Sequence, residues 1–460
     1  MFKFNFKKLG PVKEGSVTLA PFTIICGRNN VGKTYISHAI YACLLEAKKQ
    51  LLNLNTDFLH SALKADKEFK LDFDVQTIDI RTKLPSPKAI SNKISSELSK
   101  DGLAKFFNSE AISKDIKIDF EFNIDIEGLI YKNLIDEQYN LDFANITCHK
   151  PINSYELTTT FRRTEGVIET PLGPSFVALA ALNNTLNSLV NLDTYIATSE
   201  RTGIALFQPT FDSLNTQLGR DTYEVKRMRK STKYLTSSIE KLHSFPKPVM
   251  DNIEFIRTRE QQNTSKQLKN SSHLYTLFNK LIGGEFFEQS DSLEFKPTGS
   301  NISIPFSMAS SSSKSVYLIE KFIKKRAKSG SIIIIDEPEL NLHIDNQLQM
   351  ADLLAALVNS DVQVIITTHS DHMLREINML MMLGSKLADP DEKKDILEEY
   401  GFDELSVLNP DKVKAYVVSS KEGKVFDVEK TKYGLNLDLF NHEIIANNRK
   451  IRNIQESLFN

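Results

Sequence analysis

The chain has 460 residues, a formal net charge of −2, 41% hydrophobic residues and 25% charged residues. This length exceeds the size at which one hydrophobic core stops growing, so we expect two or three domains of ordinary globular composition. The small net charge excludes a general attraction to nucleic acid or membranes, and any such partner would need a local patch of charge.

The cysteine content and the hydropathy of the chain indicate a cytoplasmic protein. Its three cysteines, Cys26, Cys43 and Cys148, form no metal-binding or disulfide pattern, which suits a reducing compartment. The N-terminus lacks the apolar segment of a signal peptide, and no apolar run reaches 18 residues. We therefore expect a cytoplasmic location and no membrane partner.

The first 200 residues are predicted to mix strands and helices. In chain order, the predicted elements are a hairpin over 2–8 and 16–20, a strand over 22–26, a helix to about residue 54, a mainly helical stretch over 56–110, an antiparallel meander over 116–162, a helix over 175–190 and a strand over 194–198. The meander is predicted because apolar and polar residues alternate with a period of two.

The remainder of the chain is predicted to alternate between strands and helices. After a polar helical arm or lid over 204–280, we expect short strands over 284–306, helices over 311–328, 345–358 and 370–383, strands over 331–335 and 362–367, a hairpin over 413–418 and 424–428, and a final polar helix over 436–457. The alternation after residue 310 predicts a parallel central sheet.

A glycine-bounded loop between the strand at 22–26 and the following helix carries the strongest motif. Its sequence is Gly27-Arg28-Asn29-Asn30-Val31-Gly32-Lys33-Thr34. This is a phosphate-binding loop in its expected setting, because the glycines let backbone N–H groups face phosphate oxygens at a helix N-terminus. Lys33 is placed to reach the β- and γ-phosphates and Thr34 to offer a hydroxyl to Mg²⁺. The motif predicts binding of ATP or GTP.

Two carboxylates end the apolar strand Ser331-Ile-Ile-Ile-Ile, where α/β sheets place their ligands. Asp336 is placed to hold Mg²⁺, directly or through water, and Glu337 to polarise an attacking water. The next strand ends in His369, about thirty residues later, where a γ-phosphate sensor belongs. We predict catalytic roles for Glu337 and His369.

The order of these motifs resembles that of ABC-type ATPase heads, and in detail that of the SMC/RecF/OLD branch. The loop G-x-N-N-x-G-K-T and the sequence D-E-P-E-L-N-L-H-x-D-N-Q carry the similarity, over residues 1–50 and about 280–385. The sequences Ser-Glu-Arg-Thr-Gly at 199–203 and Thr-Thr-His-Ser at 367–370 are similar to AAA-type ATPases of prokaryotic anti-phage defence systems, such as the PARIS, Septu and retron types.

The resemblance implies an α/β fold: a P-loop head with a mixed central sheet, an antiparallel meander and an inserted helical arm. It implies ATP and Mg²⁺ as cofactors, with Glu337 as general base and His369 as switch histidine. Asp345 would belong to the D-loop. The corresponding divisions of the chain are 1–55 and 284–385 for the two parts of the head, 56–203 for an insert with the meander, 204–283 for the arm and 386–460 for a C-terminal hairpin and helix.

The Ser-rich segment 309–315 is the candidate for the signature motif of such heads, with Ser311 and Ser312 at the start of a helix. Hydroxyls and free N–H groups at a helix N-terminus suit a γ-phosphate, and in the family this motif acts on the nucleotide of a partner head. The family's usual glycine is absent here, so an N-capped polar linker remains the alternative. The resemblance therefore implies a head-to-head dimer or a larger homo-oligomer.

Three functions remain open at this point. The chain is predicted to be an anti-phage switch ATPase that controls a separate nuclease or toxin, with a RecF-like repair ATPase and a nucleotide-bound scaffold as alternatives. A phage protein or non-specific nucleic acid is the possible trigger, and the basic cluster Lys226-Arg227-Met228-Arg229-Lys230 is either a phosphate contact or a solvated helix face. Glu200 and Arg201 are either an ion pair near the nucleotide or a buried structural pair.

Overall fold

The computed structural model describes residues 2–52, 73–79, 81, 86–109, 116–123, 125–141, 144–163, 192–207, 245–257, 268–289 and 292–436. The chain divides into two compact units. Unit 1 comprises Met1–Lys3, Ala42–Leu98 and Asp119–Asp193, and unit 2 comprises Phe4–Tyr41, Ser99–Ile118 and Thr194–Asn460. All the residues predicted to bind or hydrolyse nucleotide belong to unit 2.

A six-stranded central sheet organises unit 2. Its order is β16-β15-β3-β14-β13-β9, and every neighbouring pair is parallel except β15 and β16. The strands are β3 (Phe22–Cys26), β9 (Thr194–Ala197), β13 (Ile332–Asp336), β14 (Gln363–Thr368), β15 (Val413–Val418) and β16 (Val425–Asp427). Apolar runs such as the four isoleucines of β13 suit strands that are buried on both faces. The predicted α/β class and mixed central sheet are confirmed.

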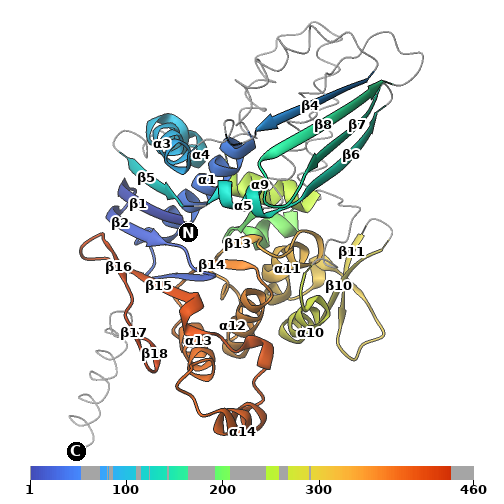
Figure 1. The fold of residues 1–460 in the computed structure, drawn as a ribbon. Helices are drawn as coiled ribbons and strands as arrows, with labels where there is room; N and C mark the ends of the chain where they lie inside the picture. The colour runs from blue at the N-terminus through green and yellow to red at the C-terminus, as the bar shows by residue number, and fades with distance from the viewer. Residues whose placement is uncertain are drawn as a thin grey trace, which may run out of the picture. The chain divides into compact units, whose positions relative to one another are not determined.

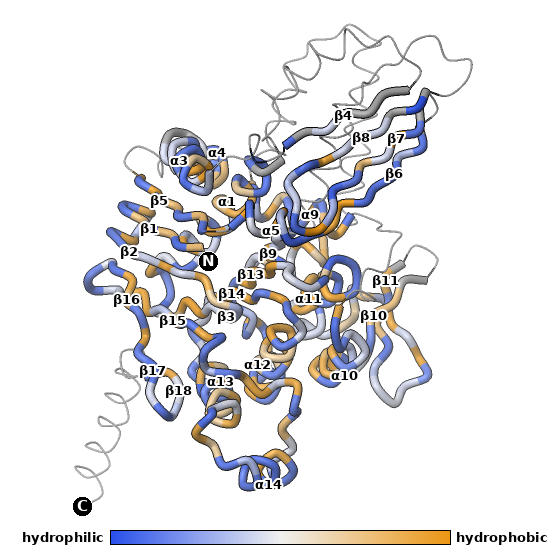
Figure 2. Tube along the Cα trace, viewed as in Figure 1, coloured by the Kyte–Doolittle hydropathy of each residue, from blue (hydrophilic) through white to orange (hydrophobic). Residues whose placement is uncertain are grey.

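Three helices follow the pattern that the sequence predicts after residue 310. They are α11 (Ser311–Lys325), α12 (Ile344–Asn359) and α13 (Asp371–Leu383). Figure 1 shows α12 and α13 together on one side of the sheet. Apolar side chains of these helices join Ile333, Ile335 and Val364 in one core, and Figure 2 shows the hydrophobic stretch of β13. Ser310 and Ser370 cap α11 and α13 by accepting from the backbone N–H three residues on.

Helices α9 (Lys247–Arg257) and α10 (Ser271–Ile282) agree with the helical prediction for 204–280. Phe255 of α9 and Phe278 of α10 belong to the same core as the central sheet, whereas Val249 and Ile253 of α9 form a separate cluster with Ile204. Antiparallel strands β10 (Gly284–Gln289), β11 (Ser292–Pro297) and β12 (Ile304–Pro305) follow, as predicted. Residues 208–244, with the basic cluster, lie outside the described residues, and the predicted arm stays a prediction.

The C-terminal hairpin of β15 and β16 is confirmed, and the structure adds a pairing that the sequence did not predict. Strand β15 pairs in parallel with β3, from Val413 opposite Phe22 to Val417 opposite Cys26. The hairpin is therefore part of the central sheet. Helix α14 (Pro390–Tyr400) begins after its cap Asp389, and β17 (Lys430–Thr431) and β18 (Gly434–Leu435) close the described chain. The helix predicted over 436–457 lies outside it.

Unit 1 contains a four-stranded antiparallel sheet of order β4-β8-β7-β6. Strands β6 (Ile135–Leu141), β7 (Ala144–Lys150) and β8 (Glu156–Arg163) form the predicted meander. Strand β4 (Phe73–Asp79) pairs with β8 along its whole length, so the helical prediction for 56–110 is wrong there. The sequence Phe-Asp-Val-Gln-Thr-Ile-Asp has the period-two alternation of a strand. Helix α3 (Pro87–Glu97) of unit 1 and helix α4 (Leu103–Phe107) of unit 2, with a π-helical turn between them in the chain, agree with that prediction.

The first strand of the predicted meander belongs to a different sheet. Strand β5 (Lys117–Phe122) joins β1 (Phe2–Leu9) and β2 (Val12–Thr18) in the order β2-β1-β5. A short helix, α5 (Ile126–Lys132), separates β5 from β6, and the side chain of Asp125 caps it by accepting from the N–H of Gly128. The meander prediction over 116–162 is therefore wrong for its first strand. The N-terminal hairpin is confirmed, with its second strand at Val12–Thr18 and not at the predicted 16–20. The helix predicted over 175–190 lies outside the described residues.

Candidate nucleotide-binding site

The phosphate-binding loop connects β3 to α1 (Lys33–Leu52), as predicted. Its two glycines adopt φ angles of +153° at Gly27 and +105° at Gly32, where L-residues with a Cβ are strained. A Cβ at Gly32 would lie 2.7 Å from Val12 Cγ2 and 2.9 Å from Pro11 Cγ. Backbone conformation and close packing thus both require glycine at this position.

Lys33 is the buried cation of the loop. It is 5% exposed, and its Nζ donates to the backbone carbonyls of Gly27 at 2.9 Å and Arg28 at 2.8 Å. Burial lowers the pKa of Lys33, and the nearby carboxylates of Glu337 and Glu339 oppose that shift. The predicted loop residues Arg28, Asn29, Asn30 and Thr34 are exposed, whereas Val31 is buried.

Asp336 ends β13 with a fully buried carboxylate that accepts from three side chains. Its Oδ1 accepts from Ser37 Oγ at 2.7 Å and from Thr367 Oγ1 at 3.1 Å. Its Oδ2 lies 3.0 Å from His38 Nε2. A carboxylate offers about four lone-pair positions, so one acceptor position remains on Oδ2. The three hydrogen bonds fix the carboxylate, and its remaining acceptor position suits a divalent cation that Asp336 holds directly or through water.

Glu337 and His369 meet just beyond the C-terminal ends of the neighbouring strands β13 and β14. His369 Nδ1 lies 3.5 Å from Glu337 Oε1. The hydrogen bond to His369 lowers the pKa of Glu337, and the same contact raises the pKa of His369. Glu337 is therefore ionised at neutral pH, which a residue that orients a water and accepts its proton requires.

The backbone of Glu337 is held in an uncommon conformation. Its φ is +49°, a left-handed value that costs a non-glycine residue free energy. Its N–H donates to the Thr367 carbonyl at 3.0 Å, and its carbonyl accepts from Arg201 at 2.7 Å. These neighbours fix the direction in which the Glu337 side chain leaves the strand end.

Glu339 is a site residue for which the sequence alone predicts no role. Its Oε1 accepts from Thr368 Oγ1 and from the His369 N–H, both at 2.8 Å, and lies 3.3 Å from His369 Nδ1. The side chain is almost fully buried, and its Oε2 has no hydrogen-bond partner. Its position two residues after the predicted base, in the sequence D-E-P-E, was the available signal. Glu339 fixes both the backbone and the ring of His369.

Arg201 acts on the strand end through backbone carbonyls. It is 0% exposed and donates to the carbonyls of Ser315 at 2.6 Å, Asp336 at 2.5 Å, Glu337 at 2.7 Å and Thr198 at 3.2 Å. Burial lowers the pKa of the Arg201 guanidinium to about 10, so it stays charged at neutral pH. Of the two alternatives for Glu200 and Arg201, the structure favours a buried structural role for Arg201, with carbonyls as its partners.

The residues predicted for the signature motif and the D-loop contact the segment that links β13 to α12 and its first turn. Ser312 Oγ donates to the Asn341 carbonyl at 2.7 Å, and Ser311 is exposed. Asp345 is exposed and lies 3.5 Å from His343 Nδ1. The structure thus brings together Lys33, Asp336, Glu337 and His369, whereas the roles predicted for Ser311, Ser312 and Asp345 stay predictions.

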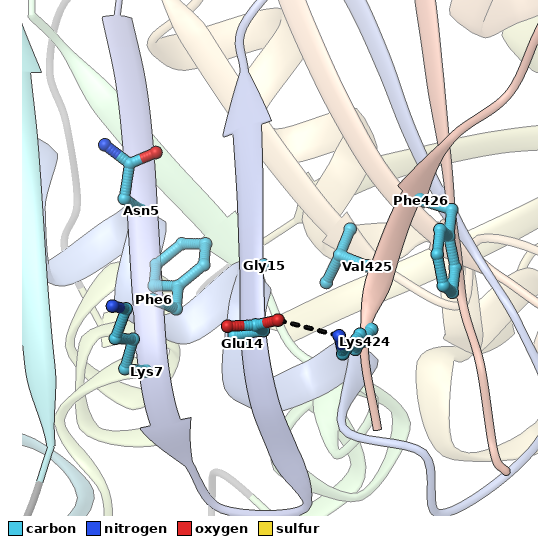
Figure 3. Close-up of a pocket in the computed structure, with 8 residues that line it drawn as sticks. All are labelled: Asn5, Phe6, Lys7, Glu14, Gly15, Lys424, Val425 and Phe426. Atoms are coloured by element: carbon cyan, nitrogen blue, oxygen red, sulfur yellow. Dashed lines mark ion pairs between the residues drawn. The ribbon is translucent and has the colours of Figure 1, made fainter. Parts of the chain in front are cut away.

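A surface pocket of unit 2 lies elsewhere, among β1, β2 and β16. An ion pair of 2.9 Å between Glu14 and Lys424 crosses it (Figure 3). The residues that line it are Asn5, Phe6, Lys7, Glu14, Gly15, Lys424, Val425 and Phe426. No predicted site residue is among them. Within the described residues, no helix is long and apolar enough to cross a membrane.

The fold and the site define a P-loop protein whose carboxylates and histidine lie at the ends of parallel strands. The model of the AAA ATPase domain family matches residues 4–374, and the chain belongs to this family. No curated protein matches the chain.

Three solved structures similar to the chain are SMC head domains. The SMC head bound to the C-terminal winged-helix domain of ScpA is 14% identical, with 93% of this chain and 96% of that chain covered and a TM-score of 0.34. The Pyrococcus furiosus SMC head with an extended coiled coil, bound to the C-terminal domain of ScpA, is 15% identical, with 98% and 100% covered and a TM-score of 0.31. The Thermotoga maritima SMC head is 10% identical, with 93% and 98% covered and a TM-score of 0.31.

Proposed function

We propose that the chain is an ABC-type ATPase that binds ATP with Mg²⁺ and hydrolyses it slowly. The observation that supports this proposal is that Lys33, Asp336, Glu337 and His369 lie together beside a phosphate-binding loop with the required glycine conformations. The carboxylates of Asp336 and Glu337 act on the pKa of Lys33, and His369 contacts Glu337. The loop amides and Lys33 would bind the phosphates of ATP. Glu337 would orient the attacking water, and His369 would hold Glu337 and sense the γ-phosphate.

Thr34 and Asp336 would hold the cation. Among the residues that the structure describes, no three His, Cys, Asp or Glu side chains form a metal-binding cluster. The remaining ligands would therefore be phosphate oxygens and water, as is usual for Mg²⁺. When bound, the cation neutralises charge on the β- and γ-phosphates. Asp336 suits this role because three hydroxyl or imidazole donors already fix its carboxylate.

Two substitutions separate binding from hydrolysis. Lys33→Ala should abolish ATP binding or turnover, because it removes the cation that reaches the phosphates. Glu337→Gln should keep ATP binding and lose hydrolysis, because it removes the base and leaves the phosphate loop intact. The measurements are fluorescence titration with an N-methylanthraniloyl ATP analogue and release of inorganic phosphate. Hydrolysis by Glu337→Gln at the parent rate would show that the catalytic assignment is wrong.

We further propose that this ATPase is a switch in anti-phage defence that controls a separate nuclease or toxin. Its support is the motif resemblance at 199–203 and 367–370. The chain free of copurifying protein should cleave neither DNA nor RNA in the presence of ATP with Mg²⁺ or Mn²⁺. Robust cleavage that is lost on mutation of an acidic residue outside the ATPase motifs would overturn this proposal.

A further inference from the structure

His38 lies on α1, one helical turn after Thr34, and faces the end of β13. Its ring is stacked on Phe107, with centroids 5.9 Å apart and an interplanar angle of 23°. The His38 side chain is 7% exposed, and its Nε2 lies 3.0 Å from the fully buried Oδ2 of Asp336. The sequence alone predicts no role for His38, because its partner is 298 positions away.

The two oxygens of Asp336 are held in different ways. Oδ1 accepts from two hydroxyls, those of Ser37 and Thr367. Oδ2 is contacted by His38, whose ring orientation is limited by the stack on Phe107. An ionised carboxylate accepts only, so His38 must donate its Nε2–H to Oδ2. The hydroxyls can rotate, whereas the imidazole N–H has a fixed direction, so His38 decides where the remaining lone pair of Oδ2 points.

We propose that His38 is a positioning residue that orients Oδ2 of Asp336 for the divalent cation bound with nucleotide. This proposal rests on the proposed ATPase function, since Asp336 is the carboxylate assigned to the cation there. A residue that hydrogen-bonds to a metal ligand generally fixes the orientation of that ligand. His38 would do this for Asp336 by donating to Oδ2. Loss of that donor should weaken cation binding more than it weakens nucleotide binding.

Two amide substitutions test the position of the donor. In His38→Gln the side-chain amide nitrogen lies near the position of Nε2, so it can still donate to Asp336. In His38→Asn the amide nitrogen lies near the position of Nδ1 and is too far away. Both variants keep a polar amide at residue 38, and they differ in the reach of its N–H. They are therefore a matched pair.

The measurement is the affinity of each protein for the N-methylanthraniloyl ATP analogue, once in EDTA and once in a Mg²⁺ titration. The Mg²⁺ concentration at half-maximal enhancement should rise about 10–100-fold in His38→Asn, the usual effect of losing such an outer partner. It should stay within about threefold of the parent in His38→Gln. Affinity in EDTA should be the same in all three proteins, because a general structural defect would lower that affinity as well.

The possible results of these titrations distinguish failure of the His38 proposal from failure of the proposed ATPase function. A parent protein that binds no nucleotide, with or without Mg²⁺, would refute the ATPase function itself. A parent that binds with Mg²⁺ while His38→Asn responds to Mg²⁺ equally well would refute only the role of His38. If His38→Asn does not fold, the result for His38→Gln decides the question. A Mg²⁺ response of His38→Gln like that of the parent supports the proposal. A folded His38→Gln protein that has normal affinity in EDTA but has lost the Mg²⁺ response overturns it.

Discussion

Glu339 shows how a single buried carboxylate organises the position of His369. One of its oxygens accepts from the Thr368 hydroxyl and the His369 N–H, and the other is buried without a partner. A buried charge with an unsatisfied oxygen is costly unless the surroundings compensate for it. The positive charges of Lys33 and Arg201 supply that compensation, since Glu339 acts on the pKa of both.

Substitution of Glu339 should separate its hydrogen bonds from its charge. Glu339→Ala should lower the free energy of unfolding by about 1–3 kcal/mol, because the Thr368 hydroxyl and the His369 N–H lose their acceptor. Glu339→Gln keeps an amide oxygen in that place and should lose less than half as much. Urea denaturation measures both, with Glu398→Ala on the exposed helix α14 as control. Equal losses in the Ala and Gln variants would contradict the role of Oε1 as an acceptor.

At the scale of elements, the parts that the sequence predicted are those whose signals are local. The strand β3, the glycine-bounded loop and α1 are contiguous, and the isoleucines of β13 need no partner to be recognised as a buried strand. The pairings of β4 with β8 and of β15 with β3 join distant segments, and only packing decides them. The same holds for the site, where Lys33, Asp336, Glu337 and His369 lie within motifs, whereas the contact of His38 with Asp336 depends on the packing of α1 against a strand end.

Helices α12 and α13 carry two carboxyl groups that influence each other, the half-buried Asp352 and the buried Glu376. Burial, with a contribution from Asp352, raises the pKa of Glu376 on α13 to about 7. Burial also raises the pKa of Asp352 on α12 to about 6, against the charge of Lys280. The ordinary pKa of Glu376 is 4.5, so the folded protein holds this proton more tightly than the unfolded chain does. The resulting stabilisation is complete below about pH 4.5 and is lost as the pH rises through about 7.

Glu376→Gln should therefore stabilise the protein in alkaline solution. At pH 8 the substitution removes the cost of ionising a buried carboxyl group, and we expect the free energy of unfolding to rise by up to about 3 kcal/mol. At pH 5 the carboxyl group is already neutral in the folded protein, so the gain should be small. Thermal unfolding at both pH values measures the difference, with the exposed Glu398→Gln as control. A gain that is the same at pH 5 and pH 8 would count against burial as its cause.

At the scale of the whole molecule, we predict that the active unit contains two heads that share their sites. In the head-to-head dimer that we predict, the Ser311–Ser312 motif of one head would act on the nucleotide held by the Lys33 of the partner head. A mixture of Lys33→Ala and Ser312→Ala proteins should therefore regain activity, because each heterodimer contains one site with both elements intact. Random pairing of equal amounts gives about one quarter of the parent rate.

The mixing experiment uses phosphate release and a mass measurement in the presence of ATP. Each variant measured alone, at the same total concentration, is the control. Full ATPase activity in a protein that remains monomeric throughout turnover would exclude shared sites, as would a mixture no more active than its components.

The place of β15 beside β3 affects how the protein reaches its active form during synthesis. The strand that leads into the phosphate-binding loop has β14 on one side and β15 on the other, and both come from much later in the chain. At ribosomal rates of about 5–20 residues per second, roughly 20–80 s pass between the emergence of β3 and that of β15. During that interval β3 exposes an unpaired apolar edge, which is a hazard for aggregation. The nascent chain therefore carries its phosphate-binding loop well before the two strands that flank β3 are available to hold the loop in shape.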